Sequence, residues 1–160
     1  MITLTRRYRF SASHRLHSDT LSPAENIGLY GKCNNPFGHG HDYVLEVTAA
    51  GEPDNLTGLL CVRAHLDALV NNHVIKLLAH RNLNVDVARF ERVVPTTENL
   101  ALFVLDLLRQ HWDAVMAESP ARLLRVHLQE TDRNGFEVAL DLPARQVVAE
   151  DRAENVIIHA

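Results

Sequence analysis

The amino-acid sequence predicts an α+β fold in which two β-hairpins are separated by two helices that cover one face of the sheet. Apolar residues alternate with polar ones near both ends of the chain, and they recur at helical spacing in the middle. Two hairpins supply four strands, and helices laid on one face of that sheet would bury its apolar side. With 160 residues, we expect residues 1–160 to form a single domain.

The first hairpin is predicted from period-2 alternation, which is typical of half-buried strands. The alternating residues are Ile2, Leu4, Tyr8 and Phe10 in the first strand, and His39, His41, Tyr43, Leu45 and Val47 in the second. A polar loop rich in Ser, Asn, Pro and Gly joins the two strands, and residues 51–55 (GEPDN) end the second one.

Two helices are predicted in the middle of the chain. Apolar residues recur every three or four positions over residues 59–78. A second helix should begin near Pro95, because Thr96 or Thr97 can cap the free backbone N–H groups and Glu98 suits the positive end of the helix dipole.

The second hairpin is predicted near the end of the chain. Residues 124–130 and 136–140 alternate, and between them Asp132, Asn134 and Gly135 are the residues that a hairpin turn needs. The segment after Pro143 receives no assignment.

Composition argues against several classes of protein. Sixteen Lys and Arg against 20 Asp and Glu give a net charge of −4, which argues against a broad nucleic-acid-binding face. The longest apolar run, residues 100–105, is far shorter than the roughly 20 residues of a membrane span. No secretory leader is apparent, and Cys33 and Cys61 cannot form a disulfide framework, so we expect a cytoplasmic protein without a membrane segment.

Three histidines predict a metal site. His39 and His41 are two residues apart in a strand, so their side chains point to the same face. His14 follows the first strand, and an antiparallel hairpin would bring it beside them. Three imidazoles with an open fourth position are typical of catalytic zinc. Cys33 could close the site as a fourth ligand, or it could act as a nucleophile or base whose thiolate zinc and Lys32 favour.

The segment SASHRL at residues 11–16 and the segment GKCNNP-x-GHGH-x-Y at residues 31–43 resemble the 6-pyruvoyl-tetrahydropterin synthase family. Further matches are NLTG at 55–58, HRNL at 80–83, PTTEN at 95–99 and ETD at 130–132. The resemblance is collinear over roughly residues 8–138. The five-residue gap between Cys33 and His39 is similar to the pyruvoyl-forming branch, whereas the related 6-carboxy-tetrahydropterin synthases of the queuosine pathway usually have a shorter gap.

The resemblance implies a tunnelling fold (T-fold), whose four-stranded antiparallel sheets join into an oligomeric barrel, commonly as trimers stacked into hexamers. It also implies a lyase that eliminates triphosphate from 7,8-dihydroneopterin triphosphate while the side chain undergoes an internal redox rearrangement. His14, His39 and His41 would bind Zn²⁺, Cys33 would be the base, and His80 would be its acid/base partner. Glu130 would bind the pterin, and the pterin-pocket segment contains Thr96, Thr97 and Glu98. Candidate triphosphate-binding cations are Arg9, Arg15, Lys32, Arg81 and Arg133.

The match is broken at two positions. Ala79 precedes His80 where the family has an aspartate, and His65 stands where the family pattern has an acidic residue. Three readings remain open: another carboxylate such as Asp67 or Asp86 serves His80, the chemistry is altered toward a carboxy-pterin or side-chain cleavage, or the protein binds a pterin without turnover.

Overall fold

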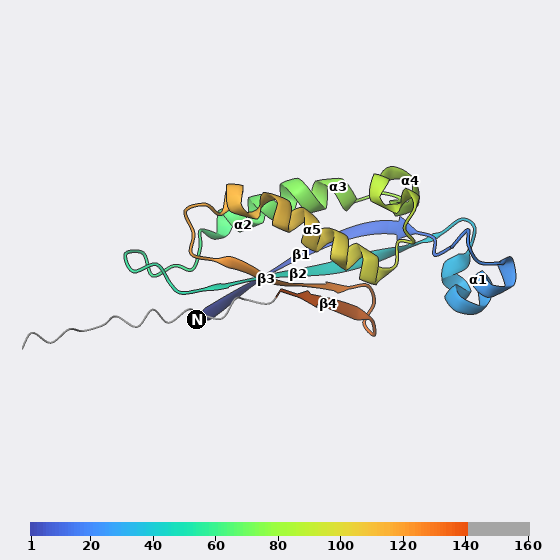
Figure 1. The fold of residues 1–160 in the computed structure, drawn as a ribbon, viewed down its shortest axis with the longest axis horizontal. Helices are drawn as coiled ribbons and strands as arrows, with labels where there is room; N and C mark the ends of the chain where they lie inside the picture. The colour runs from blue at the N-terminus through green and yellow to red at the C-terminus, as the bar shows by residue number, and fades with distance from the viewer. Residues whose placement is uncertain (141–160) are drawn as a thin grey trace, which may run out of the picture.

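The computed structural model describes residues 1–140, which form one antiparallel sheet with helices on one face (Figure 1). The strands run in the order β1 (Ile2–His14), β2 (His39–Gly51), β3 (Arg122–Gln129) and β4 (Gly135–Ala139). The predicted pair of hairpins and the predicted α+β class are therefore confirmed. The unassigned segment after Pro143 lies outside the described residues.

The first hairpin is longer than its alternating pattern predicted. β1 and β2 pair along their whole length, from Ile2 opposite Gly51 to His14 opposite His39. His14 is therefore the last residue of β1 rather than part of the loop that follows. The side chains of Tyr43, Leu45 and Val47 are fully buried beneath the helices. Because side chains alternate along a strand, Val44 and Glu46 between them lie on the opposite face of the sheet.

The loop between β1 and β2 contains two helical segments that the sequence analysis treated as a polar loop. They are α1 (Pro23–Tyr30) and the 3₁₀ helix η1 (Gly31–Asn34). Ser22 and Glu25 form a capping box at the start of α1, which satisfies free N–H groups at both residues. Figure 1 shows α1 at the tip of the hairpin, away from the other helices.

The first predicted helix is present but begins four residues later than expected. α2 (Arg63–Val70), a π-helical segment η2 (Asn71–Ile75) and α3 (Lys76–Leu78) follow one another without a break. The residues before α2 fit the helical spacing but lie outside the helix. Two short helices, α4 (Leu83–Asp86) and η3 (Ala88–Glu91), were not predicted.

The second predicted helix is confirmed as α5 (Thr97–Val115), which lies across the sheet (Figure 1). Thr96 is its N-cap and accepts the backbone N–H of Asn99. Leu100 and Leu108 on its inner face are fully buried with Leu128 of β3, so α5 and the sheet share one core. None of the helices in residues 1–140 is long and apolar enough to cross a lipid bilayer.

Candidate functional site

The three predicted histidines meet at one end of the β1–β2 hairpin. His14 and His39 are direct cross-strand partners, and His41 is the next residue along β2 on the same face. One nitrogen from each ring lies within 4.8 Å of the others, and the Nε2 atoms of His14 and His39 are 3.2 Å apart. The long antiparallel pairing thus produces the cluster that the HxH spacing predicted.

A backbone carbonyl orients the His14 ring. The Nδ1–H group of His14 lies 2.7 Å from the carbonyl oxygen of Pro95 and donates to it, which leaves Nε2 unprotonated and facing the cluster. The Nε2 atom of His41 is buried and has no hydrogen-bond partner in the described chain. A buried imidazole nitrogen without a partner costs free energy unless something binds it. The three ring nitrogens of His14, His39 and His41 therefore fit a divalent cation as ligands.

Burial keeps two of these rings neutral. It lowers the pKa of His14, and the neighbouring rings of His39 and His41 add to that effect while the Pro95 hydrogen bond opposes it. Burial and His41 likewise lower the pKa of His39. A neutral imidazole is the form that binds metal, so the cluster is prepared for a cation at neutral pH.

Glu130 lies beside the cluster, directly after β3. Its Oε1 atom is 3.7 Å from Nε2 of His14 and 3.6 Å from Nε2 of His41. The Thr97 hydroxyl donates a 2.6 Å hydrogen bond to the same Oε1 atom. The structure therefore brings Thr97 to Glu130, while Thr96 caps α5 and Glu98 is exposed in the first turn of that helix.

Cys33 lies in η1 and is partly buried. Burial raises the pKa of the Cys33 thiol, and the Glu130 carboxylate raises it further. The expected help from Lys32, the residue before Cys33, toward a thiolate stays a prediction.

His80 and His41 line the same cleft, which has a volume of about 590 Å³. His80 has a φ of +61°, and its backbone N–H donates to the carbonyl of Ser11 at 2.7 Å. Other residues around this cleft are Ser11, Ser13, Asp42, Arg81, Asn82 and Asp86.

The two carboxylates suggested as partners of His80 have different positions. Asp67 is wrong as a partner, because it receives two hydrogen bonds from Arg6 and one from Tyr8 and lies outside the cleft. Asp86 does line the cleft, where it accepts the backbone N–H of Asn82 at 2.8 Å. His65 is exposed in the first turn of α2, and nothing in the structure explains its substitution.

Sequence reasoning missed two contributors to this region, the carbonyl of Pro95 and the side chain of Asp42. Every residue has a backbone carbonyl, so the sequence does not single out the one of Pro95. Asp42 lies on the face of β2 opposite to His39 and His41, so the histidine pattern did not include it. Among the candidate cations, Arg15 donates to the Asn34 carbonyl at 3.1 Å, and Arg81 lines the cleft.

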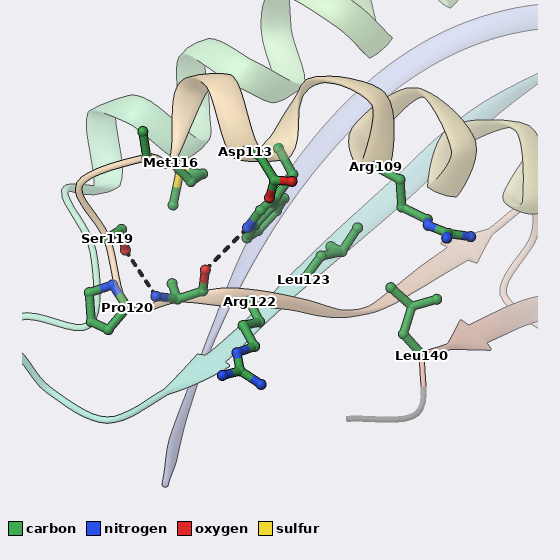
Figure 2. Close-up of a pocket in the computed structure, with 11 residues that line it drawn as sticks. Arg109, Asp113, Met116, Ser119, Pro120, Arg122, Leu123 and Leu140 are labelled. Carbon is green, nitrogen blue, oxygen red and sulfur yellow. Dashed lines mark hydrogen bonds between the residues drawn. The ribbon is translucent and has the colours of Figure 1, made fainter. Parts of the chain in front are cut away.

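A second hollow, of about 820 Å³, lies between the end of α5, the start of β3 and Leu140 (Figure 2). Arg109, Asp113 and Arg122 line it together with apolar side chains, but none of the predicted site residues does. Trp112 donates its indole N–H to the Ala121 carbonyl there. This hollow is larger than the cleft of His80, but it lacks the cluster of metal-ligating groups.

A four-stranded antiparallel sheet with helices on one face and a cluster of three histidines defines an α+β protein with a candidate metal site. The family model described as 6-pyruvoyl tetrahydropterin synthase matches residues 3–140. The chain belongs to this family.

Comparison with individual relatives supports the same family. The chain is 44% identical over 132 residues to a 6-pyruvoyl tetrahydrobiopterin synthase of Homo sapiens, covering 82% of this chain and 86% of the relative. A solved structure of Caenorhabditis elegans 6-pyruvoyl tetrahydropterin synthase superimposes with a TM-score of 0.78 at 40% identity, over 88% of this chain and 96% of that one. A Pyrococcus furiosus dihydroneopterin monophosphate aldolase is 33% identical over 100 residues, covering 62% of this chain and 76% of the relative. The similarity confirms the predicted family and the T-fold, while the barrel of several sheets stays a prediction.

Proposed function

We propose that this protein is a zinc-dependent lyase that converts 7,8-dihydroneopterin triphosphate into 6-pyruvoyl-tetrahydropterin and triphosphate. The observation that carries the proposal is the meeting of His14, His39 and His41 at one end of β1 and β2. Relatives that are more than 40% identical over most of the chain, and are named 6-pyruvoyl tetrahydrobiopterin synthases, support the same reaction.

The three histidines would hold the zinc ion. When bound, zinc supplies a Lewis acid that acidifies C–H and O–H groups of the substrate side chain. Imidazole ligands suit zinc among the divalent metals, although other ions also accept them.

Cys33 and His80 would move the protons. Burial and Glu130 raise the pKa of the Cys33 thiol, which favours its protonated form. It would therefore act as a base only when positive charge nearby favours its thiolate. His80 would exchange protons with the substrate from the cleft that it shares with His41.

Glu130 would bind the pterin ring. A carboxylate can accept two parallel N–H groups from a guanidine-like ring edge. The Thr97 hydroxyl donates a 2.6 Å hydrogen bond to Oε1 of Glu130, and Oε2 of Glu130 makes no hydrogen bond within residues 1–140. The free oxygen and the remaining capacity of Oε1 suit such a ligand.

Triphosphate release by the purified protein tests this proposal. We expect release from 7,8-dihydroneopterin triphosphate that a chelator abolishes and added Zn²⁺ restores. His39→Ala should lose both bound zinc and turnover, whereas His65→Ala, an exposed histidine outside the cluster, should keep both. Turnover that is unaffected by the chelator and by His39→Ala would contradict the proposal.

The product decides between this reaction and its alternatives. The similarity to an enzyme named dihydroneopterin monophosphate aldolase favours side-chain cleavage as the second candidate. A 6-hydroxymethyl product would support cleavage, a 6-carboxy product would support the queuosine-type reaction, and tight pterin binding without product would support a non-catalytic protein.

A further inference from the structure

His80 lacks the carboxylate neighbour that its role calls for, because residue 79 is alanine. Within the described residues its ring makes no hydrogen bond that would fix which nitrogen carries the proton. An acid/base histidine works well only when a partner on one nitrogen holds its tautomer and orientation. The carboxylates of the surrounding cleft are the candidates for that partner.

Asp42 and Asp86 are the two carboxylates that line the cleft with His80. Asp86 is engaged within its own short helix, since its Oδ2 atom accepts the backbone N–H of Asn82, the N-cap residue of α4. Asp42 is held differently, because the Ser11 hydroxyl donates a short hydrogen bond to its Oδ1 atom. That contact holds the Asp42 carboxylate against Ser11, in the cleft that His80 also lines.

Ser11 lies between His80 and Asp42. The His80 backbone N–H donates to the Ser11 carbonyl on one side of β1, and Asp42 is the cross-strand partner of Ser11 on the other side. Each step between neighbouring extended segments is about 4.8 Å, so the backbones of His80 and Asp42 are about 10 Å apart. Cross-strand partners share a face of the sheet, so the Ser11 hydroxyl and the Asp42 carboxylate lie together. An imidazole of His80 turned over β1 would come within reach of both.

The backbone of His80 is held in an uncommon conformation. Its φ of +61° lies in the left-handed region that residues other than glycine rarely adopt. The hydrogen bond from His80 to Ser11 and the one from the Ser13 N–H to the Arg81 carbonyl, at 2.9 Å, fasten this segment to the edge of β1. Strain of this kind, about 1–3 kcal/mol, persists where the surroundings hold a functional side chain in place.

We propose that Asp42, held by Ser11, is the positioning residue that orients the His80 imidazole in place of an aspartate at position 79. This role rests on the proposed lyase function for its effect on turnover. Asp42 of β2 and His80, which follows α3, would then act together. Both are brought to this place because β1 pairs with β2 on one side and with the segment after α3 on the other.

A second-site rescue tests the proposal. Asp42→Asn should lower kcat for triphosphate release by about 10–100-fold with KM within about 3-fold of wild type, because orientation of an acid/base group acts in the transition state. Ala79→Asp should change the wild type little but should restore most of the lost kcat in the Asp42→Asn background. Glu46→Gln changes another carboxylate on the same face of β2, outside the cleft, and should leave kcat unchanged.

A spectroscopic measurement separates failure of this proposal from failure of the proposed function. Nitrogen-15 spectra of the histidine rings should show one dominant His80 tautomer in the wild type and a mixture in Asp42→Asn, even if no triphosphate is released. Unchanged spectra and unchanged kcat in Asp42→Asn would overturn the proposal. A loss of kcat without rescue by Ala79→Asp, or the same tautomer change in Asp86→Asn instead, would also overturn it.

Discussion

At the scale of single residues, Thr97 connects the start of α5 to the carboxylate beside the histidine cluster. Thr97→Val keeps the shape of the side chain but removes the 2.6 Å hydrogen bond to Glu130. Because hydrogen bonds to charged groups contribute about 1.5–3 kcal/mol, we expect pterin affinity to fall by roughly 10–100-fold. Titration with neopterin, followed by fluorescence, measures this change.

Thr96→Ala is the matched control for Thr97→Val. Thr96 caps α5 through the N–H of Asn99 and makes no hydrogen bond to Glu130. Its loss should cost about 1 kcal/mol of stability and leave pterin affinity nearly unchanged. Equal losses of affinity in the two variants would show that Thr97 acts only through the helix.

Cys33 gives a residue-level prediction about reactivity. Burial and Glu130 raise the pKa of its thiol, so the metal-free protein has less thiolate at pH 7 than a free cysteine has. In a Cys61→Ser background, alkylation of Cys33 by iodoacetamide should be slower than that of a model thiol at pH 7 and should accelerate as the pH rises toward 10. Glu130→Gln removes the negative charge and should speed alkylation at pH 7. Fast alkylation at neutral pH without metal would contradict this prediction.

At the scale of elements, the long regular segments could be predicted from the sequence and the short irregular ones could not. Period-2 alternation identified both hairpins, and the Thr-Thr-Glu start identified α5, because each pattern repeats over many residues. The segments α1, α4 and η3 span eight residues or fewer, so they carry too little periodicity. The π-helical turn at Asn71–Ile75 keeps the same apolar spacing as an α-helix and leaves no separate signal.

In the candidate site, too, local patterns could be predicted from the sequence and long-range contacts could not. The histidine cluster could be predicted because HxH spacing and antiparallel pairing determine it locally. The Pro95 carbonyl, the Thr97–Glu130 contact and the cleft shared by Asp42 and His80 depend on segments far apart in the sequence. Those contacts are set by how helices and strands pack, which single-sequence patterns do not encode.

Gly38 is the element-scale test of how the hairpin positions its histidines. It has a φ of +68°, and a Cβ there would lie 2.8 Å from the carbonyl oxygen of His14. Gly38→Ala must shift the backbone beside His14 and His39. With a strain of about 1–3 kcal/mol, zinc affinity should fall by roughly 10–100-fold in a competition titration with a chelator.

Gly40→Ala is the matched glycine variant on the same strand. Its Cβ would meet the Ala12 carbonyl oxygen at an ordinary 3.6 Å, and its φ is not positive. Zinc affinity should therefore remain near that of the wild type. If Gly40→Ala weakened zinc binding as much as Gly38→Ala, backbone strain at Gly38 would not be the cause.

At the scale of the whole molecule, the buried His14 and the half-buried His39 link stability to pH. Burial lowers the pKa of His14 and His39 below the ordinary 6.5, so the unfolded chain binds more protons than the folded one below that pH. The free energy of unfolding of the metal-free protein should fall as the pH drops from 7.5 to 5.5. Thermal melts across this range measure it, and the slope should be smaller for His14→Asn. A melting temperature that rises toward pH 5.5 would contradict the sign.

The outer edges of the sheet carry the last prediction, which concerns assembly. Within residues 1–140, β1 and β4 each pair with one neighbouring strand, and the segment after α3 bonds to β1 only at Ser11 and Ser13. Open edges favour pairing with another chain, and a barrel of several sheets would pair β4 of one subunit with β1 of the next. Light scattering should therefore give a mass of three or six times 18.0 kDa.

Hydrogen exchange would locate the contact that produces this mass. Amides on the outer edges of β1 and β4 should be protected in the oligomer and exchange quickly after dilution to subunits, whereas amides between β2 and β3 should stay protected in both states. A monomeric mass at micromolar concentration, or an oligomer whose β1 and β4 edge amides exchange freely, would rule out assembly through these edges.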